Sequence, residues 1–231
     1  MIAELKQARR FNETIILFAF STLCLVLSLY RILISETSMF LFLNWNLFLA
    51  FIPWALSSTL IIYPKLQMKK LAVFSLFGTW LLFFPNAPYI LTDLFHLNLN
   101  SSMPMWFDLL LILSFAWVGL MFGFMSLWDI EKILTNYWQS SRLKKIVKAT
   151  IAVPLVSMLL LLLGSFGIYL GRYLRWNSWD IIQEPFSIIY DIGDRVINPF
   201  SHPRTWGVTL FMWLFLSLVY WSLKLIRSRR N

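Results

Sequence analysis

Three side chains suited to acid–base chemistry lie close together at the end of an apolar run. They are Tyr89, Asp93 and His96, in the segment FFPNAPYILTDLFHL at residues 83–97. Spacings of four and three residues place them on one helix face together with Asn86. Carboxylates, imidazoles and phenols transfer protons in active sites, so we predict Asp93 and His96 as catalytic residues. Asn86 and Tyr89 are predicted to bind the ligand. The alternative is a polar face that only pins the helices together.

A second polar group follows the segment GSFGIYLGRYLRWNSWD at residues 164–180. It consists of Arg172, Arg175, Asn177 and Asp180. Guanidinium groups bind phosphates and carboxylates through paired hydrogen bonds, so we predict these four as ligand-binding residues. We also expect Asp93 to lie close to Arg172 or Arg175. The alternative is that both arginines extend to the membrane surface beside an aromatic belt.

The sequence contains no established motif for a metal or a nucleotide. His96 and His202 are the only histidines, and with Asp93 they would give three zinc ligands, but at a spacing typical of no known site. We therefore predict no metal. Walker A, G-x-S-x-G and H-E-x-x-H motifs are absent from the sequence, and the sequence leaves any cofactor unknown.

The composition indicates a membrane protein. Of the 231 residues, 59% are hydrophobic and 13% are charged, whereas soluble domains are about half apolar and about a quarter charged. Apolar windows of the length of a membrane span, roughly 20 residues, recur along the chain. The net charge of +9 lies in short segments between these windows, as in membrane topology signals, and we predict no nucleic-acid partner.

We predict an all-α, polytopic transmembrane bundle of about six spans that forms a single membrane domain over 1–231. The expected spans are 14–34, 40–62, 71–95, 106–128, 148–171 and 206–226. If the N-terminus is cytoplasmic, fifteen of the twenty Lys and Arg residues lie on the inner side. The expected location is a bacterial plasma membrane with both termini in the cytoplasm.

Two local features interrupt this pattern of spans. The third span is predicted to break at Pro85–Pro88, because proline cannot continue the hydrogen-bond ladder and moves Phe84 away from helical geometry. Asn86 is the expected N-cap of a second half-helix. Near 185–198, apolar and polar residues separate to opposite sides, which predicts an interfacial amphipathic helix on the outer face. Asp191 and Arg195 are expected to pair along it.

The two quoted segments, in this order and in a chain of this length, resemble a family of bacterial integral membrane proteins. It is catalogued as domain of unknown function 1361. The resemblance extends from about residue 40 to residue 225. It implies a multi-pass membrane protein and transfers no activity and no catalytic residue.

The best hypothesis for function is an extracytoplasmic-facing polar site that binds or modifies an envelope lipid or a lipid-linked precursor. One alternative is a non-catalytic subunit or scaffold of a membrane complex, and a second is a small-solute transporter. The lipid bilayer is the one certain partner. The sequence decides neither whether the protein is an enzyme nor which proteins it contacts.

Overall fold

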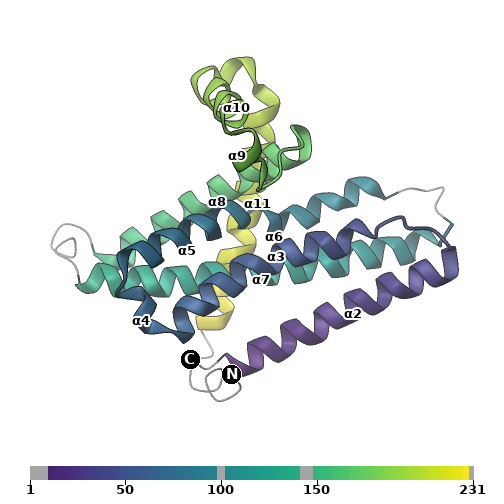
Figure 1. The fold of residues 1–231 in the computed structure, drawn as a ribbon, viewed down its shortest axis with the longest axis horizontal. Coiled ribbons are helices and arrows are strands. Elements are labelled where there is room, and N and C mark those ends of the chain that lie inside the picture. Colours follow the sequence, from purple (N-terminus) through teal and green to yellow (C-terminus); the bar gives the residue numbers. More distant parts are fainter. Residues whose placement is uncertain (1–9, 98–101, 141–147, 229–231) are drawn as a thin grey trace. The chain divides into compact units, whose positions relative to one another are not determined.

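The computed structural model describes residues 10–97, 102–140 and 148–228, and every regular element in these ranges is a helix (Figure 1). Six of these helical segments are long and apolar enough to cross a membrane. They are α2 (Phe11–Ser35), α3 (Phe42–Ile62), α5 to η1 (Lys70–His96), α7 (Met105–Ser140), α8 (Ala149–Tyr173) and α11 (Pro203–Ser228). Each overlaps one predicted span, which confirms the all-α bundle of six spans.

Some of the cations behind the predicted orientation lie outside the described residues. They are Lys6, Arg9, Arg142, Lys144, Lys145, Arg229 and Arg230. The chain divides into two compact units, Met1–Ile133 and Leu134–Asn231. The single membrane domain over 1–231 stays a prediction.

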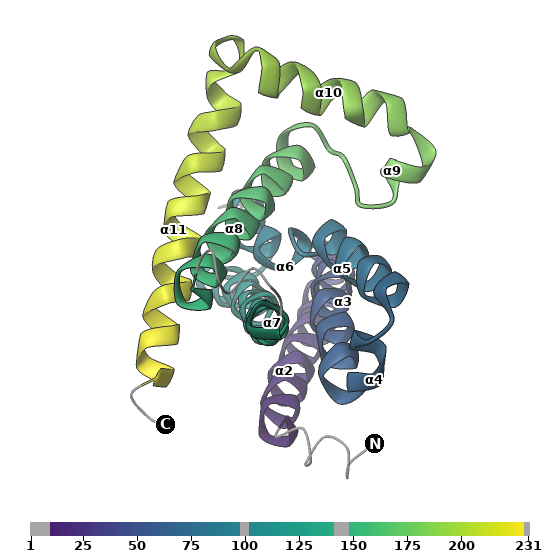
Figure 2. The ribbon, with the colours of Figure 1, turned by 90° about the vertical axis from the view of Figure 1, so that its left-hand side faces the viewer.

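The first unit is a bundle in which α2, α3, α5 and α7 run side by side (Figures 1 and 2). α7 is its central helix, since 61% of its apolar window is buried, against 22% for α2. Leu47 of α3, Ile90 of η1 and Phe115 of α7 belong to one hydrophobic core. We call the end where α2 begins the Arg10 end, and the end where η1 finishes the His96 end.

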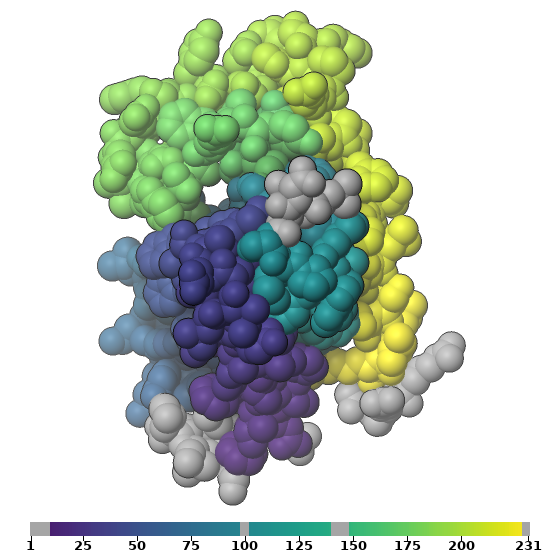
Figure 3. Space-filling model, turned by 90° about the vertical axis from the view of Figure 1, so that its right-hand side faces the viewer, coloured from purple at the N-terminus to yellow at the C-terminus, as the bar shows by residue number. Residues whose placement is uncertain are grey.

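Ion pairs from Arg31 of α2 and from Arg10, the residue just before α2, fasten this helix to α7 at both ends. Arg31 is 1% exposed and binds the fully buried Asp108 through Nε–Oδ1 (2.7 Å) and Nη2–Oδ2 (3.2 Å). At the Arg10 end, Nη1 of Arg10 donates to the carboxylate of Asp129. The space-filling view shows α2 in purple and α7 in teal on one face of the molecule (Figure 3). A charge at membrane depth requires such a partner.

The third span is interrupted where predicted, but in a different manner. α5 ends at Phe83, and a four-residue helix, α6 (Asn86–Tyr89), leads into the 3₁₀ helix η1 (Ile90–His96). Phe84 keeps helical angles (φ −54°, ψ −41°), as does Pro85, so the expected departure of Phe84 from helical geometry is wrong. Proline at the first turn of a helix tolerates these angles because its missing N–H would have no partner there.

Asn86 is not the N-cap of the restarted helix. Pro85 occupies that position without a side-chain cap, and Nδ2 of Asn86 instead donates to the carbonyl of Phe83 at 3.0 Å. The amide of Ala87 bonds to Phe84 at 3.2 Å rather than to Phe83. The Asn86 side chain therefore satisfies a backbone carbonyl at the interruption, whereas the sequence predicted that it would accept a hydrogen bond from a backbone N–H.

The second unit contains α8 and α11 packed together, joined by α9 (Asp180–Gln183), α10 (Pro185–Ile197) and η3 (Pro199–Ser201). Nε1 of Trp213 donates to the carbonyl of Met158 at 2.9 Å across the α8–α11 pair. Figure 2 shows α10 lying across the end of α11. α10 is the predicted amphipathic helix, with Phe186 86% exposed and Ile188 buried.

Candidate functional site

Asp93 is held inside the first unit at its His96 end. The side chain is 1% exposed, and its Oδ2 accepts a hydrogen bond from Nδ2 of Asn46, on α3, at 2.8 Å. Burying a carboxylate costs several kcal/mol unless hydrogen bonds compensate for the lost water, and the amide supplies one. α3 therefore fixes the position of this carboxylate.

His96 lies beside Asp93 and reaches the surface. Its Nδ1 is 3.9 Å from Oδ1 of Asp93, and the imidazole is 46% exposed. Residues three apart eclipse each other in a 3₁₀ helix, so η1 aligns these two side chains more closely than an α-helix would. The ring also packs on Phe42, with centroids 5.1 Å apart. The result is a half-exposed imidazole backed by a buried carboxylate.

The other two residues predicted on this face, Asn86 and Tyr89, lie in α6 and are partly buried. The Asn86 amide is directed to its own turn, and the Tyr89 carbonyl accepts from the hydroxyl of Thr92 at 2.7 Å. Because the chain tightens from α to 3₁₀ after Tyr89, the four residues do not follow one α-helical face.

Aromatic rings connect this pair to the ion pair at the same end. The guanidinium of Arg31 lies 4.8 Å from the ring centroid of Phe40, and Phe40 contacts Phe42 at 6.1 Å. Phe40 is 2% exposed and has φ of 68°. A bulky residue in the left-handed region costs on the order of 1–3 kcal/mol and persists only where its surroundings enforce it. Arg31 holds this conformation in place, because it contacts the Phe40 ring and its Nη1 donates to the carbonyl of the preceding residue, Met39, at 3.1 Å.

The second predicted group lies in the other unit, where α8 ends. Arg172 is in the last turn of α8, and Arg175 is exposed with φ of 63°. Asn177 and Asp180 bind each other, with the backbone N–H of Asn177 donating to Oδ2 of Asp180 at 2.6 Å. These two close a local turn. The expected contact of Asp93 with Arg172 or Arg175 stays a prediction.

A polar network, of which the sequence predicted only the Asp191–Arg195 pair, fastens α10 to the start of α11. Its central residues are Trp176, Asp191, Asp194, Arg195, Asn198, His202 and Trp206. The predicted Asp191–Arg195 pair is present at 3.1 Å. The hydrogen bond from Asn198, and to a lesser extent the one with His202, lowers the pKa of Asp194 below its ordinary value.

Sequence reasoning missed Asn46, Asp108 and Asp129 as partners of buried groups. A signal was available for Asn46, because an asparagine within an apolar span requires a partner. Asp108 and Asp129 stand at the two ends of the predicted fourth span, where a carboxylate is ordinarily attributed to the interface. Within the described part of the chain, no three His, Cys, Asp or Glu residues gather as a metal site would require.

Six apolar helices of spanning length, counted over the described residues, define a multi-pass α-helical membrane protein. The chain belongs to the family described as "Protein of unknown function (DUF1361)", which it matches over residues 45–219, as the resemblance suggested. No curated protein and no solved structure matches it.

Proposed function

We propose that the protein binds a membrane lipid, or a precursor linked to a lipid, at the His96 end of its first unit, and that His96, supported by the Asp93 carboxylate, transfers protons on that ligand. The observation that carries this proposal is the exposure of the pair, with His96 46% exposed and Asp93 1% exposed, 3.9 Å apart. One group can meet a ligand while the other stays shielded from water.

The chemistry assigns one role to each residue of the pair. His96 accepts or donates a proton at its exposed nitrogen, and the Asp93 carboxylate stabilises the imidazolium that forms. Asn46 keeps the carboxylate in place through its 2.8 Å hydrogen bond. The 3.9 Å contact is longer than a hydrogen bond, and contacts of this kind often tighten when a ligand binds.

The end of a span is where the head group of a lipid lies. Arg172 and Arg175 are proposed to bind a phosphate of such a ligand, together with Asn177 and Asp180. We further propose a bacterial plasma membrane with both termini in the cytoplasm, so that the His96 end faces outward. The Lys and Arg bias of the sequence supports this orientation.

The test is a comparison of lipids and lipid-linked precursors in cells that carry chromosomal variants. His96→Ala should reproduce the lipid profile of a deletion strain, because loss of acid–base catalysis slows a reaction by about 10²–10⁴-fold. Phe95→Ala removes a neighbouring, 70% exposed ring and should leave the profile unchanged. Immunoblots establish equal protein levels. A normal profile for His96→Ala at a normal protein level refutes the proposal.

A second candidate is a non-catalytic subunit of a membrane complex, and one observation favours it. Asp93, Asp108 and Asp129 are each bonded by a residue of another helix or of the segment before α2, so all three can be structural links. In that case Asp93→Asn lowers protein abundance while His96→Ala changes nothing. A changed lipid profile for His96→Ala at a normal protein level excludes this reading.

A further inference from the structure

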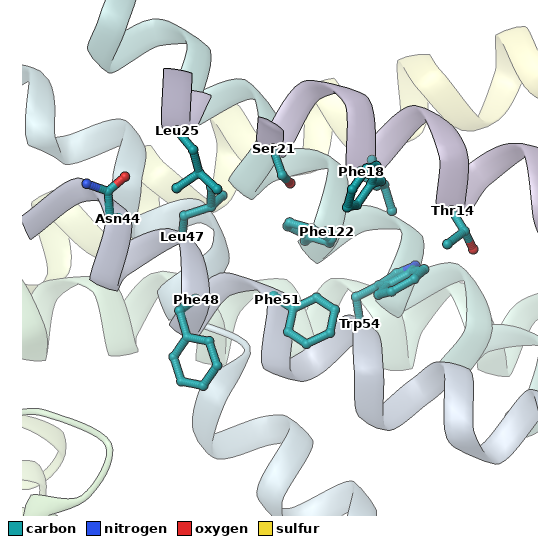
Figure 4. Close-up of a pocket in the computed structure, with 11 residues that line it drawn as sticks. Thr14, Phe18, Ser21, Leu25, Asn44, Leu47, Phe48, Phe51, Trp54 and Phe122 are labelled. Carbon is teal, nitrogen blue, oxygen red and sulfur yellow. The ribbon is translucent and has the colours of Figure 1, made fainter. Parts of the chain in front are cut away.

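An apolar groove of about 310 Å³ lies between α2 and α3, on the bundle side facing α7. Figure 4 shows Phe18 and Ser21 of α2 on one side, Phe51 and Trp54 of α3 on the other, and Phe122 of α7 behind them. The volume falls in the range of ligand pockets, about 300–1,000 Å³. Apolar cavities stay dry and take up hydrocarbon rather than water.

The groove lies along the parts of α2 and α3 that are long and apolar enough to cross a membrane. Arg10 and Arg31 are separated by 21 residues, which is about 32 Å of helix and close to the ~30 Å of a hydrocarbon core. The groove extends from Thr14 to Leu25 along α2, about 16 Å. That is the depth of about one leaflet, starting near the Arg10 end.

Buried donors without hydrogen-bond acceptors lie at that same end. Trp54 is 8% exposed and lines the groove, and its Nε1 has no hydrogen-bond partner among the described residues. Arg10 is 3% exposed and lies 5.3 Å from the Trp54 ring. Its Nε and Nη2 likewise make no hydrogen bond within the described ranges. Unsatisfied buried donors are costly, by about 1–3 kcal/mol each, and they indicate a ligand that carries acceptors.

The charges around Arg10 select the kind of acceptor. Asp129 binds its Nη1, and the carboxylate of Glu13 lies 3.8 Å from its Nη2. The two carboxylates more than neutralise the single guanidinium, so a phosphate would meet net negative charge. An uncharged carbonyl oxygen would not.

We propose that the groove binds one acyl chain of an ester-linked membrane lipid, with the ester carbonyl at Trp54 and Arg10. This site is separate from the proposed His96 site. Asn44 lines the groove, whereas Asn46 bonds to Asp93, and residues two apart lie on opposite sides of a helix. An experiment can therefore disprove one of the two proposed sites and leave the other standing.

The first experiment maps lipid contacts on the full-length protein. The protein is reconstituted in phosphatidylcholine vesicles, in which a fraction of the lipid carries a diazirine in its acyl chain. The vesicles are irradiated, and the labelled positions are identified by peptide mass spectrometry. Labels should concentrate on groove residues such as Ser21 and Phe51 over Val26 and Leu29, which are exposed on α2. Labels spread evenly over the exposed residues would show surrounding lipid only and would overturn the proposal.

The second experiment fills the groove. Ser21→Trp places an indole inside it, whereas Thr22→Trp places the same group at the next, exposed position. Labelling of Phe51 should fall about tenfold or more for Ser21→Trp, because the indole excludes several methylene groups of the chain, and stay unchanged for Thr22→Trp. Circular dichroism verifies the helical content, and Ser21→Leu repeats the test if the larger substitution unfolds the protein. Equal labelling in both variants contradicts the proposal.

The third experiment tests the carbonyl contact with ester- and ether-linked phosphatidylcholine in equal amounts. Lipids retained after detergent washing are counted by mass spectrometry. The wild type should retain the ester form about threefold to tenfold more, the gain expected of one hydrogen bond. Trp54→Phe keeps an aromatic ring, loses the N–H donor and should reduce the preference for the ester form, because only the Arg10 donors remain. Equal retention by the wild type refutes the placement of the ester.

Discussion

At the scale of single residues, paired charges inside the bundle are the main finding. Arg31 and Asp108 are both essentially inaccessible to solvent, and every nitrogen of the guanidinium has a partner, including Thr37 Oγ1 at 3.0 Å from Nη1. Such a pair adds little stability relative to apolar residues of similar size, but removing one member leaves an uncompensated charge. Charge pairing thus links α2 to α7 specifically.

Removing one member of this pair should destabilise the fold strongly. We expect Asp108→Leu to lower the free energy of unfolding by about 3–5 kcal/mol, because the Arg31 charge then lacks a counter-ion. The double variant Arg31→Met with Asp108→Leu should recover most of that loss. Unfolding by denaturing detergent, followed by circular dichroism, measures both. A double variant as unstable as the single one would contradict this account of the pair.

Asp194 provides a second prediction at this scale. Because folding lowers the pKa of its carboxyl group, its contribution to stability is present above the ordinary value of 3.8 and is lost as the pH falls through the lowered pKa. Asn198→Ala removes the largest cause and should raise the pKa of Asp194. Asn177→Ala, an identical change at an asparagine that binds Asp180 instead, is the control. Carboxyl ¹³C NMR titration in micelles measures the pKa; an unchanged value in Asn198→Ala would disprove the assignment.

At the scale of elements, close packing between α6 and α7 determines how the third span fits the bundle. A Cβ added at Gly119 would lie 2.6 Å from the Ala87 carbonyl oxygen, and one at Gly123 would lie 3.1 Å from the Ala87 Cβ. Small residues four apart let membrane helices approach closely. The interrupted span therefore packs closely against the glycines of α7. This packing holds the start of η1 against the bundle, and Asp93, three residues after Ile90, is buried there.

Gly119→Ala should destabilise the protein by about 1–3 kcal/mol, because the methyl group overlaps backbone that cannot move aside easily. Gly78→Ala in α5 is the matched control, since a Cβ there meets nothing within 4 Å. That variant should be neutral or more stable, as alanine favours helix. Thermal unfolding in micelles compares the two. Equal effects would show that the α6–α7 contact is looser than these distances imply.

At the scale of the whole molecule, the proposed orientation specifies which side of the membrane each end faces. The chain has one cysteine, Cys24, which is buried. A Cys24→Ser background therefore supports single-cysteine labelling at exposed positions such as Lys65 and Ser102. Lys65 follows α3, and Ser102 follows η1, so a membrane span separates them.

With both termini in the cytoplasm, Ser102→Cys should react with a membrane-impermeant maleimide in intact cells. Lys65→Cys should react only after the membrane is opened, because the Lys and Arg bias places that segment inside. Labelling is read by mass shift on gels, and permeabilised cells provide the total. The reverse pattern would invert the proposed orientation and place the His96 end in the cytoplasm.

The sequence predicted those parts of the fold that depend on local pattern. The six spans follow from apolar length, α10 and its Asp191–Arg195 pair follow from helical periodicity, and the interruption at Pro85 follows from proline chemistry. The form of that interruption was mispredicted, because proline fits an early helical position as readily as it ends a helix.

The partners of the buried charges were decided only by tertiary structure. Asn46 and Asp93 are 47 positions apart, and Arg31 and Asp108 are 77 positions apart. Which helix faces which depends on packing, and an apolar surface that suits lipid also suits many neighbouring helices, so local pattern leaves the choice open. The sequence by itself thus determined that this chain spans a membrane and carries Asp93 and His96 near the end of a span. The packing of α2, α3 and α7 decided that Asp93 is buried behind His96 and that an apolar groove opens beside Trp54.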